Sequence, residues 1–256
     1  MKKRILIVTV VMIFALSAVS AYSQILISDN FNSFDPALWG DYSHDGGYVT
    51  AENGYLKMGT TKDVRFGRGQ ISSNFSLAGN FDSSIDFDLV KFNDFFSSAT
   101  FGIWARDNTF AMLLTRKFDM NSTNYYEEVD WMVNGNWQTG FSAVTSDVTG
   151  KLRLSRFGST LSAYYFSAGD WQLGNSLALP SGFDSAVRVF VEVGNDGNAG
   201  NAPAVEVHYD NFVADAGNIT GVNSRYLIPN PEPGTVILLG TGLLGMGAFS
   251  YFRKRR

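Results

Sequence analysis

The chain has 256 residues, of which 20 are basic and 24 are acidic, and it contains no cysteine. The absence of cysteine excludes disulfide bonds, thiolate metal sites and cysteine nucleophiles, so an apolar core must hold any folded domain together. Because the only histidines are His44 and His208, a histidine-rich metal site is excluded as well.

The first 21 residues have the layout of a secretory signal. Basic residues at 2–4 precede the apolar stretch Ile5–Leu16, and the small residues Val19-Ser20-Ala21 follow it. This arrangement predicts a Sec-type signal peptide over 1–21, which signal peptidase removes after Ala21. The alternative is a signal anchor that stays in the membrane, but this apolar stretch is short for a membrane span.

Residues 22–215 carry strand patterns separated by turn signals. Apolar and polar side chains alternate, as in strands with one buried face, in the segments Ile85–Leu89, Leu152–Leu154, Val187–Val193 and Val205–Tyr209. Hairpin turns are predicted at the dipeptides Asp107-Asn108, Asn134-Gly135 and Gly158-Ser159. Short strands joined by antiparallel turns predict one all-β domain, an antiparallel β-sandwich.

The same region resembles the concanavalin A-like jelly rolls of laminin G-type and legume-lectin-type domains. The stretches that carry the likeness are Asp29–Phe31 with Phe34–Trp39, Gly150–Arg156 with Leu161–Tyr165 and Trp171, and Val207–Phe212. The resemblance implies a sandwich whose closing strand pairs with its first strand. It also implies, by analogy, a structural Ca²⁺ at Asp29 and Asp210, since calcium prefers oxygen ligands. No other cofactor is expected.

Glu128-Val129-Asp130 is a candidate for catalytic chemistry. It resembles the Glu-x-Asp-x-(x)-Glu strand of jelly-roll glycosidases that cut β-glucans, in which two glutamates about 5 Å apart act as nucleophile and acid/base. Here positions 132–134 are Met, Val and Asn, so the second glutamate is missing and the sequence predicts a protein that is not an enzyme. The alternative is a glycoside hydrolase or lyase with a non-standard site around Glu128 and Asp130.

Aromatic side chains are the candidates for ligand binding. Trp131 and Trp137 flank the predicted turn at Asn134-Gly135, and with Tyr125 and Tyr126 they predict a platform on which sugar rings stack. The alternative is that these aromatic side chains fill the core between the two sheets.

The end of the chain has the layout of a second sorting signal. After an expected linker over 216–229, the residues Asn230-Pro231-Glu232-Pro233 precede an uncharged stretch, 235–252, and then Arg253-Lys254-Arg255-Arg256. Eighteen helical residues extend for about 27 Å, which nearly matches a hydrocarbon core of about 30 Å. The sequence therefore predicts a transmembrane helix over 235–252, with the basic end in the cytoplasm.

This tail, residues 230–256, resembles the PEP-CTERM sorting signal of Gram-negative bacteria. The resemblance rests on Pro231-Glu232-Pro233, the single apolar span and the terminal basic cluster. It implies export across the inner membrane, transient anchoring through the C-terminal helix, and cleavage near Pro-Glu-Pro by the protease exosortase. The mature protein would then be at the cell surface or outside the cell. The alternative is a permanent C-terminal anchor.

Removal of both ends changes the charge of the protein. Seven of the 20 basic residues and one of the 24 acidic residues lie outside 22–231, so the mature fragment keeps 13 and 23, a formal charge of 13 − 23 = −10. This charge disfavours binding to nucleic acid or anionic lipid. The sequence predicts an exported surface or biofilm-matrix protein, with a non-catalytic binding or structural module whose candidate ligand is exopolysaccharide.

Overall fold

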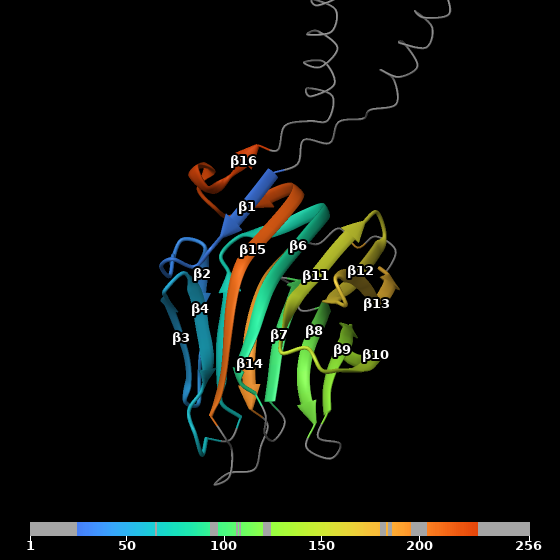
Figure 1. Cartoon of the computed structure of the whole chain (residues 1–256). Coiled ribbons are helices and arrows are strands. Elements are labelled where there is room, and N and C mark those ends of the chain that lie inside the picture. The colour runs from blue at the N-terminus through green and yellow to red at the C-terminus, as the bar shows by residue number, and fades with distance from the viewer. Residues whose placement is uncertain are drawn as a thin grey trace, which may run out of the picture. The chain divides into compact units, whose positions relative to one another are not determined.

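The computed structural model describes residues 25–229, apart from 65, 93–96, 106, 108, 120–123, 180–182, 184–185 and 196–203 (Figure 1). The expected signal peptide over 1–21, with its cleavage site at Ala21, lies outside the described residues. So does the expected sorting segment over 230–256, with its transmembrane helix over 235–252. Within the described part of the chain, no helix is both long and apolar enough to cross a membrane.

Apart from one turn of 3₁₀ helix, η1 (Ser224–Tyr226), the regular elements of the described residues are strands. Their bounds are β1 (Ile25–Asp29), β2 (Trp39–Asp41), β3 (Gly47–Glu52), β4 (Tyr55–Thr60), β5 (Arg68–Ser73), β6 (Ser76–Lys91), β7 (Ser97–Ala105), β8 (Phe110–Asp119), β9 (Asn124–Val133), β10 (Asn136–Thr145), β11 (Thr149–Phe157), β12 (Thr160–Ser167), β13 (Asp170–Ala178), β14 (Val187–Asn195), β15 (Val205–Thr220) and β16 (Ile228–Pro229).

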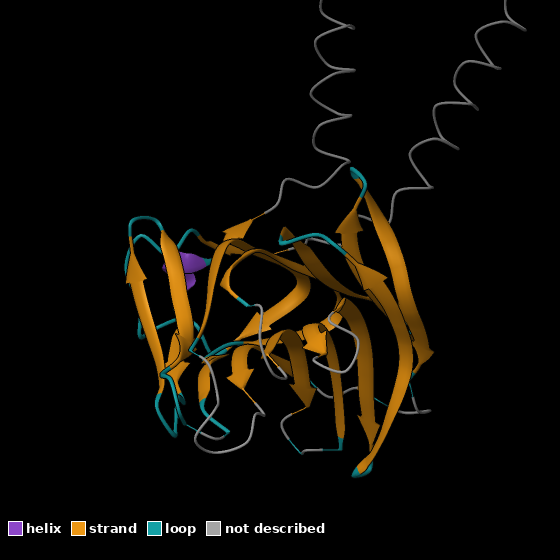
Figure 2. Ribbon diagram, turned by 60° about the horizontal axis from the view of Figure 1, so that its bottom comes forward, coloured by secondary structure: helices purple, strands orange, loops and turns teal. Residues whose placement is uncertain are grey.

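These strands pair antiparallel and fold into two layers (Figures 1 and 2). The front sheet has the order β2-β5-β14-β7-β8-β9-β10. The back sheet has the order β13-β12-β11-β6-β15, and β15 continues to β1 and to the β4–β3 hairpin. One pair, Val187 with Leu77, links β14 of the front sheet to β6 of the back sheet. The expected antiparallel sandwich is confirmed.

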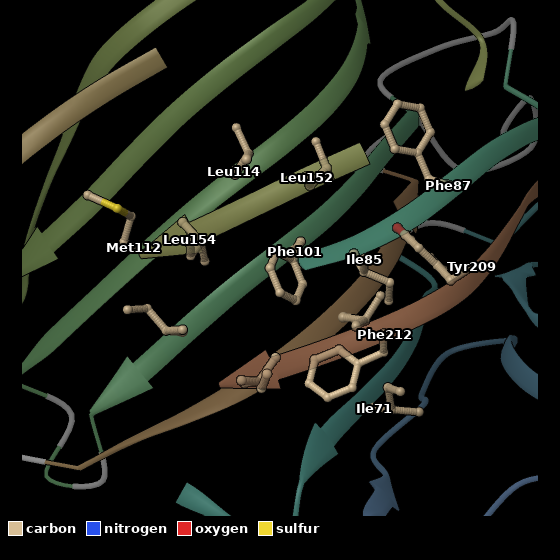
Figure 3. Packing of buried hydrophobic residues seen from close by; sticks show 14 of the residues in the cluster. Ile71, Ile85, Phe87, Phe101, Met112, Leu114, Leu152, Leu154, Tyr209 and Phe212 are labelled. Carbon is tan, nitrogen blue, oxygen red and sulfur yellow. The ribbon is translucent and has the colours of Figure 1, made fainter. Parts of the chain in front are cut away.

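The core lies between the two sheets because each strand turns every second side chain inward. Phe101 on β7 and Met112 on β8 come from the front sheet, and Ile85 on β6 and Leu152 on β11 come from the back sheet (Figure 3). All four side chains are buried. Apolar area removed from water in this way stabilises the fold by about 25 cal/mol per Å².

The turns follow the dipeptide signals. Asn134 and Gly135 both have positive φ, 50° and 80°, as a type I′ turn requires, and β9 pairs with β10 across them. The predicted hairpins β7–β8 and β11–β12 are also confirmed by their pairing. Asn53-Gly54 closes a further hairpin, β3–β4, with the same signs of φ.

The pairing of the closing strand with the first strand, implied by the jelly-roll resemblance, is confirmed, since Asp29 of β1 pairs with Phe212 of β15. The domain limit at 215 is wrong, because β15 continues to Thr220 and buries Ala216 and Ile219. The expected linker over 216–229 is wrong for the same reason, since it contains the end of β15, η1 and β16. β16 pairs with β1, so the back sheet includes residues up to Pro229, two positions before Pro231.

Replacing Gly47 with alanine is expected to lower the free energy of unfolding by about 2–3 kcal/mol. A Cβ there would lie 1.8 Å from the backbone oxygen of Arg68, and no side-chain rotation can relieve a clash with backbone. Urea denaturation of residues 22–230 measures the effect. Gly217→Ala is the matched control: the nearest atoms to its Cβ, Asn80 O and Ala78 O, are 3.8 and 3.9 Å away. Equal stability of the two variants would contradict the prediction.

Candidate functional site

The outer face of the front sheet, the side turned away from the core, carries an aromatic row made of Phe190, Trp104 and Trp137. Residues that pair directly across strands share a face, and the register joins Trp104 to Ala111, Ala111 to Met132 and Met132 to Trp137. The rings of Trp104 and Trp137 meet edge to face with centroids 6.1 Å apart, and Trp104 and Phe190 do so at 6.2 Å. The three rings therefore form one row across β14, β7 and β10.

Gly102 makes this row possible. It pairs with Phe190, and a Cβ on Gly102 would lie 2.3 Å from two carbons of the Phe190 ring. The ring therefore occupies the space that any larger residue at 102 would fill. At the other end of the row, the Trp137 side chain is 48% exposed. The row thus has a packed end at Phe190 and an open end at Trp137.

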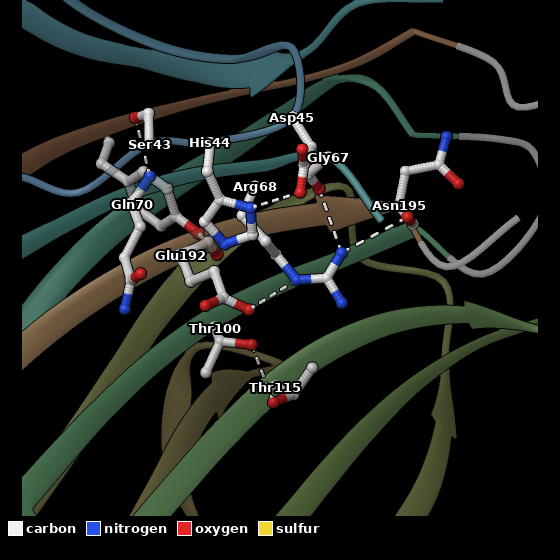
Figure 4. Close-up of polar contacts among 11 residues, drawn as sticks. Ser43, His44, Asp45, Gly67, Arg68, Gln70, Thr100, Thr115, Glu192 and Asn195 are labelled. Carbon is white, nitrogen blue, oxygen red and sulfur yellow. Dashed lines mark hydrogen bonds and ion pairs between the residues drawn. The ribbon is translucent and has the colours of Figure 1, made fainter. Parts of the chain in front are cut away.

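A polar row runs beside the aromatic row on the same face. The register places Glu192 next to Thr100, Thr100 next to Thr115, and Thr115 next to Glu128. The two threonine hydroxyls lie 3.0 Å apart. The guanidinium of Arg68 lies 3.1 Å from the Glu192 carboxylate, and Figure 4 shows this pair above the two threonines. The two threonines are buried, so the part of this row that is open to a hydroxyl-rich ligand is the pair Arg68 and Glu192, which offers both donors and acceptors.

Glu128 and Asp130 share this outer face. Glu128 lies 3.4 Å from the ammonium of Lys117, and Asp130 accepts a 2.6 Å hydrogen bond from the Thr139 hydroxyl. Burial raises the pKa of Glu128, Lys117 opposes that rise, and the neighbouring Asp130 adds to it. The next residue of β9 on this face is Met132, which is 6% exposed. Met132 is one of the positions at which the Glu-x-Asp-x-(x)-Glu pattern would carry its second glutamate, and its side chain has no carboxyl group.

The raised pKa of Glu128 predicts a pH-dependent effect on stability. Folding disfavours the charged form of this carboxylate. Below the ordinary pKa of 4.5 the side chain is neutral in both states and does not change the free energy of unfolding. As the pH rises through the folded-state pKa, the charged form lowers that free energy. Glu128→Gln is therefore expected to unfold at higher urea than the parent chain at pH 7. The two should be equal near pH 3.5. A Gln variant that is less stable than the parent at pH 7 would contradict this sign.

The structure does not bring Trp131 and Trp137 together. Trp131 pairs with Met112, whose side chain is in the core, so Trp131 faces inward, and its ring occupies the place of a Cβ on Gly140. Trp137 pairs with Met132 and faces outward. Among the proposed platform residues whose side chains are described, Trp137 is thus the one on the outer face. Tyr125 and Tyr126 belong to β9, but their side chains lie outside the described residues.

The expected calcium residues lie near each other, but their oxygens already have partners. The Asp29 carboxylate accepts hydrogen bonds from Phe31 N at 2.8 Å and from Trp39 Nε1 at 2.9 Å, and burial raises its pKa. Asp210 accepts from Asn211 N at 2.6 Å. Within the described residues no group of three or more acidic or histidine side chains could hold a metal ion. Because calcium also takes carbonyl and water oxygens, the expected site at Asp29 and Asp210 stays a prediction.

Beyond the described domain, residues 231–256 match a known sequence family. The chain ends in a PEP-CTERM protein-sorting motif. This motif implies export, processing by exosortase and sorting to the cell surface. The match includes Pro231, Glu232 and Pro233 and the basic end Arg253-Lys254-Arg255-Arg256. No curated protein matches the chain in sequence.

The domain is similar in structure to proteins that are themselves diverse. The CBM2 module of the evolved Dit protein of Lactobacillus casei BL23 phage J-1 has a TM-score of 0.57 at 10% identity, over 75% of this chain and 96% of that one. LamAcat from Zobellia galactanivorans has a TM-score of 0.56 at 12% identity, over 78% of this chain and 99% of that one. A GH16 protein of the Bacteroides ovatus mixed-linkage glucan system, solved with its G4G4G3G product, has a TM-score of 0.54 at 10% identity, over 75% of this chain and 99% of that one. At these identities the likeness establishes the jelly-roll fold and says nothing of the ligand.

Two members of the aromatic row, Trp104 and Phe190, were not among the ligand-binding residues predicted from the sequence. Both lie in strands rich in small or β-branched residues, on the face opposite to the side chains that fill the core between the sheets. A bulky ring on the outward phase of a strand is the signal that could have found them. Their meeting depends on the register of β14 and β7, which no local pattern specifies.

Proposed function

We propose that this exosortase-sorted protein is a non-catalytic polysaccharide-binding protein of the cell surface or extracellular matrix, and that the ligand lies along the outer face of its front sheet. The observation that carries the proposal is the half-exposed ring of Trp137, held edge to face against Trp104. A sugar ring that stacks on Trp137 buries its apolar C–H surface against the indole. A fixed ring loses little conformational entropy when it binds.

The polar row supplies the second half of a sugar site. Sugar hydroxyls need partners that both donate and accept, and Asp130 with Thr139 lies one row from Trp137 along β9 and β10. Glu128 and Glu192, which are partly exposed, continue this polar surface toward β14. Aromatic rings beside a few converging polar groups are the usual composition of a site for a small polar ligand.

The spacing of the carboxylates supports a binding role over a catalytic one. Glycosidases need two carboxyl groups about 5 Å apart to retain configuration, or roughly 6.5–9.5 Å apart to invert it. Glu192 is separated from Glu128 by β7 and β8, which puts their backbones roughly 14 Å apart at about 4.8 Å per strand. Asp130, the carboxylate next to Glu128 on this face, already accepts a hydrogen bond from the Thr139 hydroxyl.

A glycoside hydrolase is the second candidate, and one observation favours it. The raised pKa of Glu128, on the outer face of a jelly roll, is a property of general acids. A reducing-sugar assay on laminarin, mixed-linkage glucan and the host's exopolysaccharide decides between the candidates. Product release by the parent chain that disappears in Glu128→Gln would establish the hydrolase and overturn the non-catalytic proposal.

Binding itself is tested with residues 22–230, which contain every described strand and the whole core. We expect retention on a panel of neutral polysaccharides in affinity electrophoresis, and a dissociation constant by calorimetry on the polymer that retains it. The panel includes the exopolysaccharide of the producing host. Retention by no member of the panel would remove the binding proposal.

Processing gives a further prediction. We expect the mature protein, purified from its native host, to lack the basic end Arg253–Arg256 and to finish near Pro231, because the sorting motif implies exosortase cleavage. Intact-mass spectrometry measures the C-terminus directly. A Glu232→Ala chain, which breaks the Pro-Glu-Pro tripeptide, is the matched comparison and should keep its tail. A native chain that retains Arg256 would instead establish a permanent anchor.

A further inference from the structure

The outer face of the back sheet carries a second aromatic cluster, which we define as Tyr164 and Phe166 of β12 with Trp171 of β13. Phe166 pairs directly with Trp171, and the two rings meet edge to face with centroids 5.5 Å apart. Tyr164 pairs with Leu173, whose side chain is 54% exposed. The three rings are half-buried, so each still presents part of its surface to solvent.

One cation, Arg153, contacts two of the three rings of this cluster. The guanidinium of Arg153 lies over both Tyr164 and Trp171, 5.2 and 5.6 Å from the ring centroids, and it is ion-paired with Asp82. Arg153 projects from β11 between Leu152 and Leu154, which are both buried in the core, so it belongs to the outer face. Stacking on a cation held by a carboxylate limits the motion of both rings.

A cleft of about 410 Å³ opens beside Phe166. Its polar lining comes from Asp86, Asp147, Thr149, Lys151 and Ser167. The ammonium of Lys151 lies 2.9 Å from the Asp86 carboxylate, and the Ser167 hydroxyl donates to Asp147 at 2.7 Å. The cleft therefore joins an aromatic wall to groups that donate and accept hydrogen bonds.

We propose that this cleft and the aromatic cluster form a second polysaccharide-binding site, so that one molecule links two polysaccharide chains. The inference rests on the proposed function for the nature of the ligand. Its location is independent, because the two sites lie on the outer faces of two sheets that pack through a common core. A chain bound at Trp137 and a chain bound at Trp171 therefore lie on opposite sides of the domain. This is the geometry of a cross-linking protein.

The charges of the face favour a neutral polymer. Lys151 and Arg153 are each matched by a carboxylate, Asp86 and Asp82, so neither ion pair presents a net charge to a ligand. Asp88 and Asp210 lie farther along the same sheet face, and the mature fragment carries a formal charge of −10. An acidic polymer or a nucleic acid would be repelled, whereas hydroxyl groups can bond to both members of each ion pair.

The test uses residues 22–230 and the neutral polysaccharide that the parent chain binds best in the panel described above. Calorimetry with an oligosaccharide of that polymer gives the stoichiometry, and turbidity of the long polymer reports cross-linking. We expect two oligosaccharides per parent chain. We expect one per chain for Trp171→Ala, with at least tenfold less turbidity and an unchanged affinity at the remaining site. Trp171→Phe, which keeps a ring, should recover most of the turbidity.

The outcomes separate this inference from the proposed function. A parent chain that binds one oligosaccharide, or a Trp171→Ala chain that still binds two, would overturn the second site and leave the first intact. No binding by the parent chain would overturn both. Sedimentation of each variant without ligand completes the test: a parent dimer that Trp171→Ala converts to a monomer would identify the cluster as a self-association surface, and this too would overturn the inference.

Discussion

Replacing Trp39 with alanine is expected to lower the free energy of unfolding by about 3–5 kcal/mol. Trp39 is 1% exposed and lies among three phenylalanines, with ring centroids 6.0 Å from Phe31, 5.8 Å from Phe75 and 4.9 Å from Phe212. These rings join the β1–β2 connection to β15 and to the turn before β6. Truncation leaves a cavity that a rigid sheet cannot close. Urea denaturation of residues 22–230 at pH 7 measures the loss.

The indole nitrogen of Trp39 also stabilises the fold, through a hydrogen bond. Trp39 Nε1 donates to Asp29, whose other oxygen accepts from Phe31 N. Trp39→Phe keeps most of the ring but leaves one partly buried oxygen of Asp29 without its donor, so we expect a loss of about 1–3 kcal/mol. In the double mutant with Asp29→Ala the two losses should not add, because each substitution removes the same hydrogen bond between Trp39 and Asp29. If Trp39→Ala cost no more than Trp39→Phe, the cavity argument would fail.

The fold could be predicted from the sequence wherever a short local pattern determines the backbone conformation or the buried face. The dipeptide Asn134-Gly135 determines a two-residue turn because both positions need positive φ. The alternation of Leu152 and Leu154 with charged residues determines which face is buried, and both leucines are in the core. The end of β15 was harder to predict, because a bulge between Ala216 and Asn218 breaks the alternation before Ile219 returns to the core.

The candidate site was only partly predictable from the sequence, and the wrong placement of Trp131 beside Trp137 could have been avoided. A two-residue turn at 134–135 makes 133 pair with 136 and 132 with 137, so Trp137 had to share a face with Met132 and not with Trp131. The partnership of Trp104 with Trp137 could not be derived in this way. It depends on the registers of three successive hairpin pairs, β7–β8, β8–β9 and β9–β10, and a shift of one residue in any of them would separate the rings.

Replacing Trp137 with alanine is expected to weaken polysaccharide binding at the front sheet by at least tenfold. Exposed aromatic anchors contribute about 2 kcal/mol or more at the centre of a binding surface, and Trp137 is the open end of the aromatic row. Stability should change little, because the ring is half in solvent. Calorimetry with the best oligosaccharide of the panel measures the loss for this site.

Phe157→Ala is the matched control for Trp137→Ala. Phe157 is 81% exposed at the end of β11, which belongs to the back sheet, so its removal deletes an exposed aromatic ring away from the front-sheet site. Gly102→Ala tests the same row from its buried end, because the new Cβ must displace the Phe190 ring that packs against Trp104. A weaker affinity in Gly102→Ala would mean that the row acts as a unit. Equal affinities for Trp137→Ala and Phe157→Ala would mean that the ligand lies elsewhere, since stacking on the exposed indole is the interaction on which this site depends.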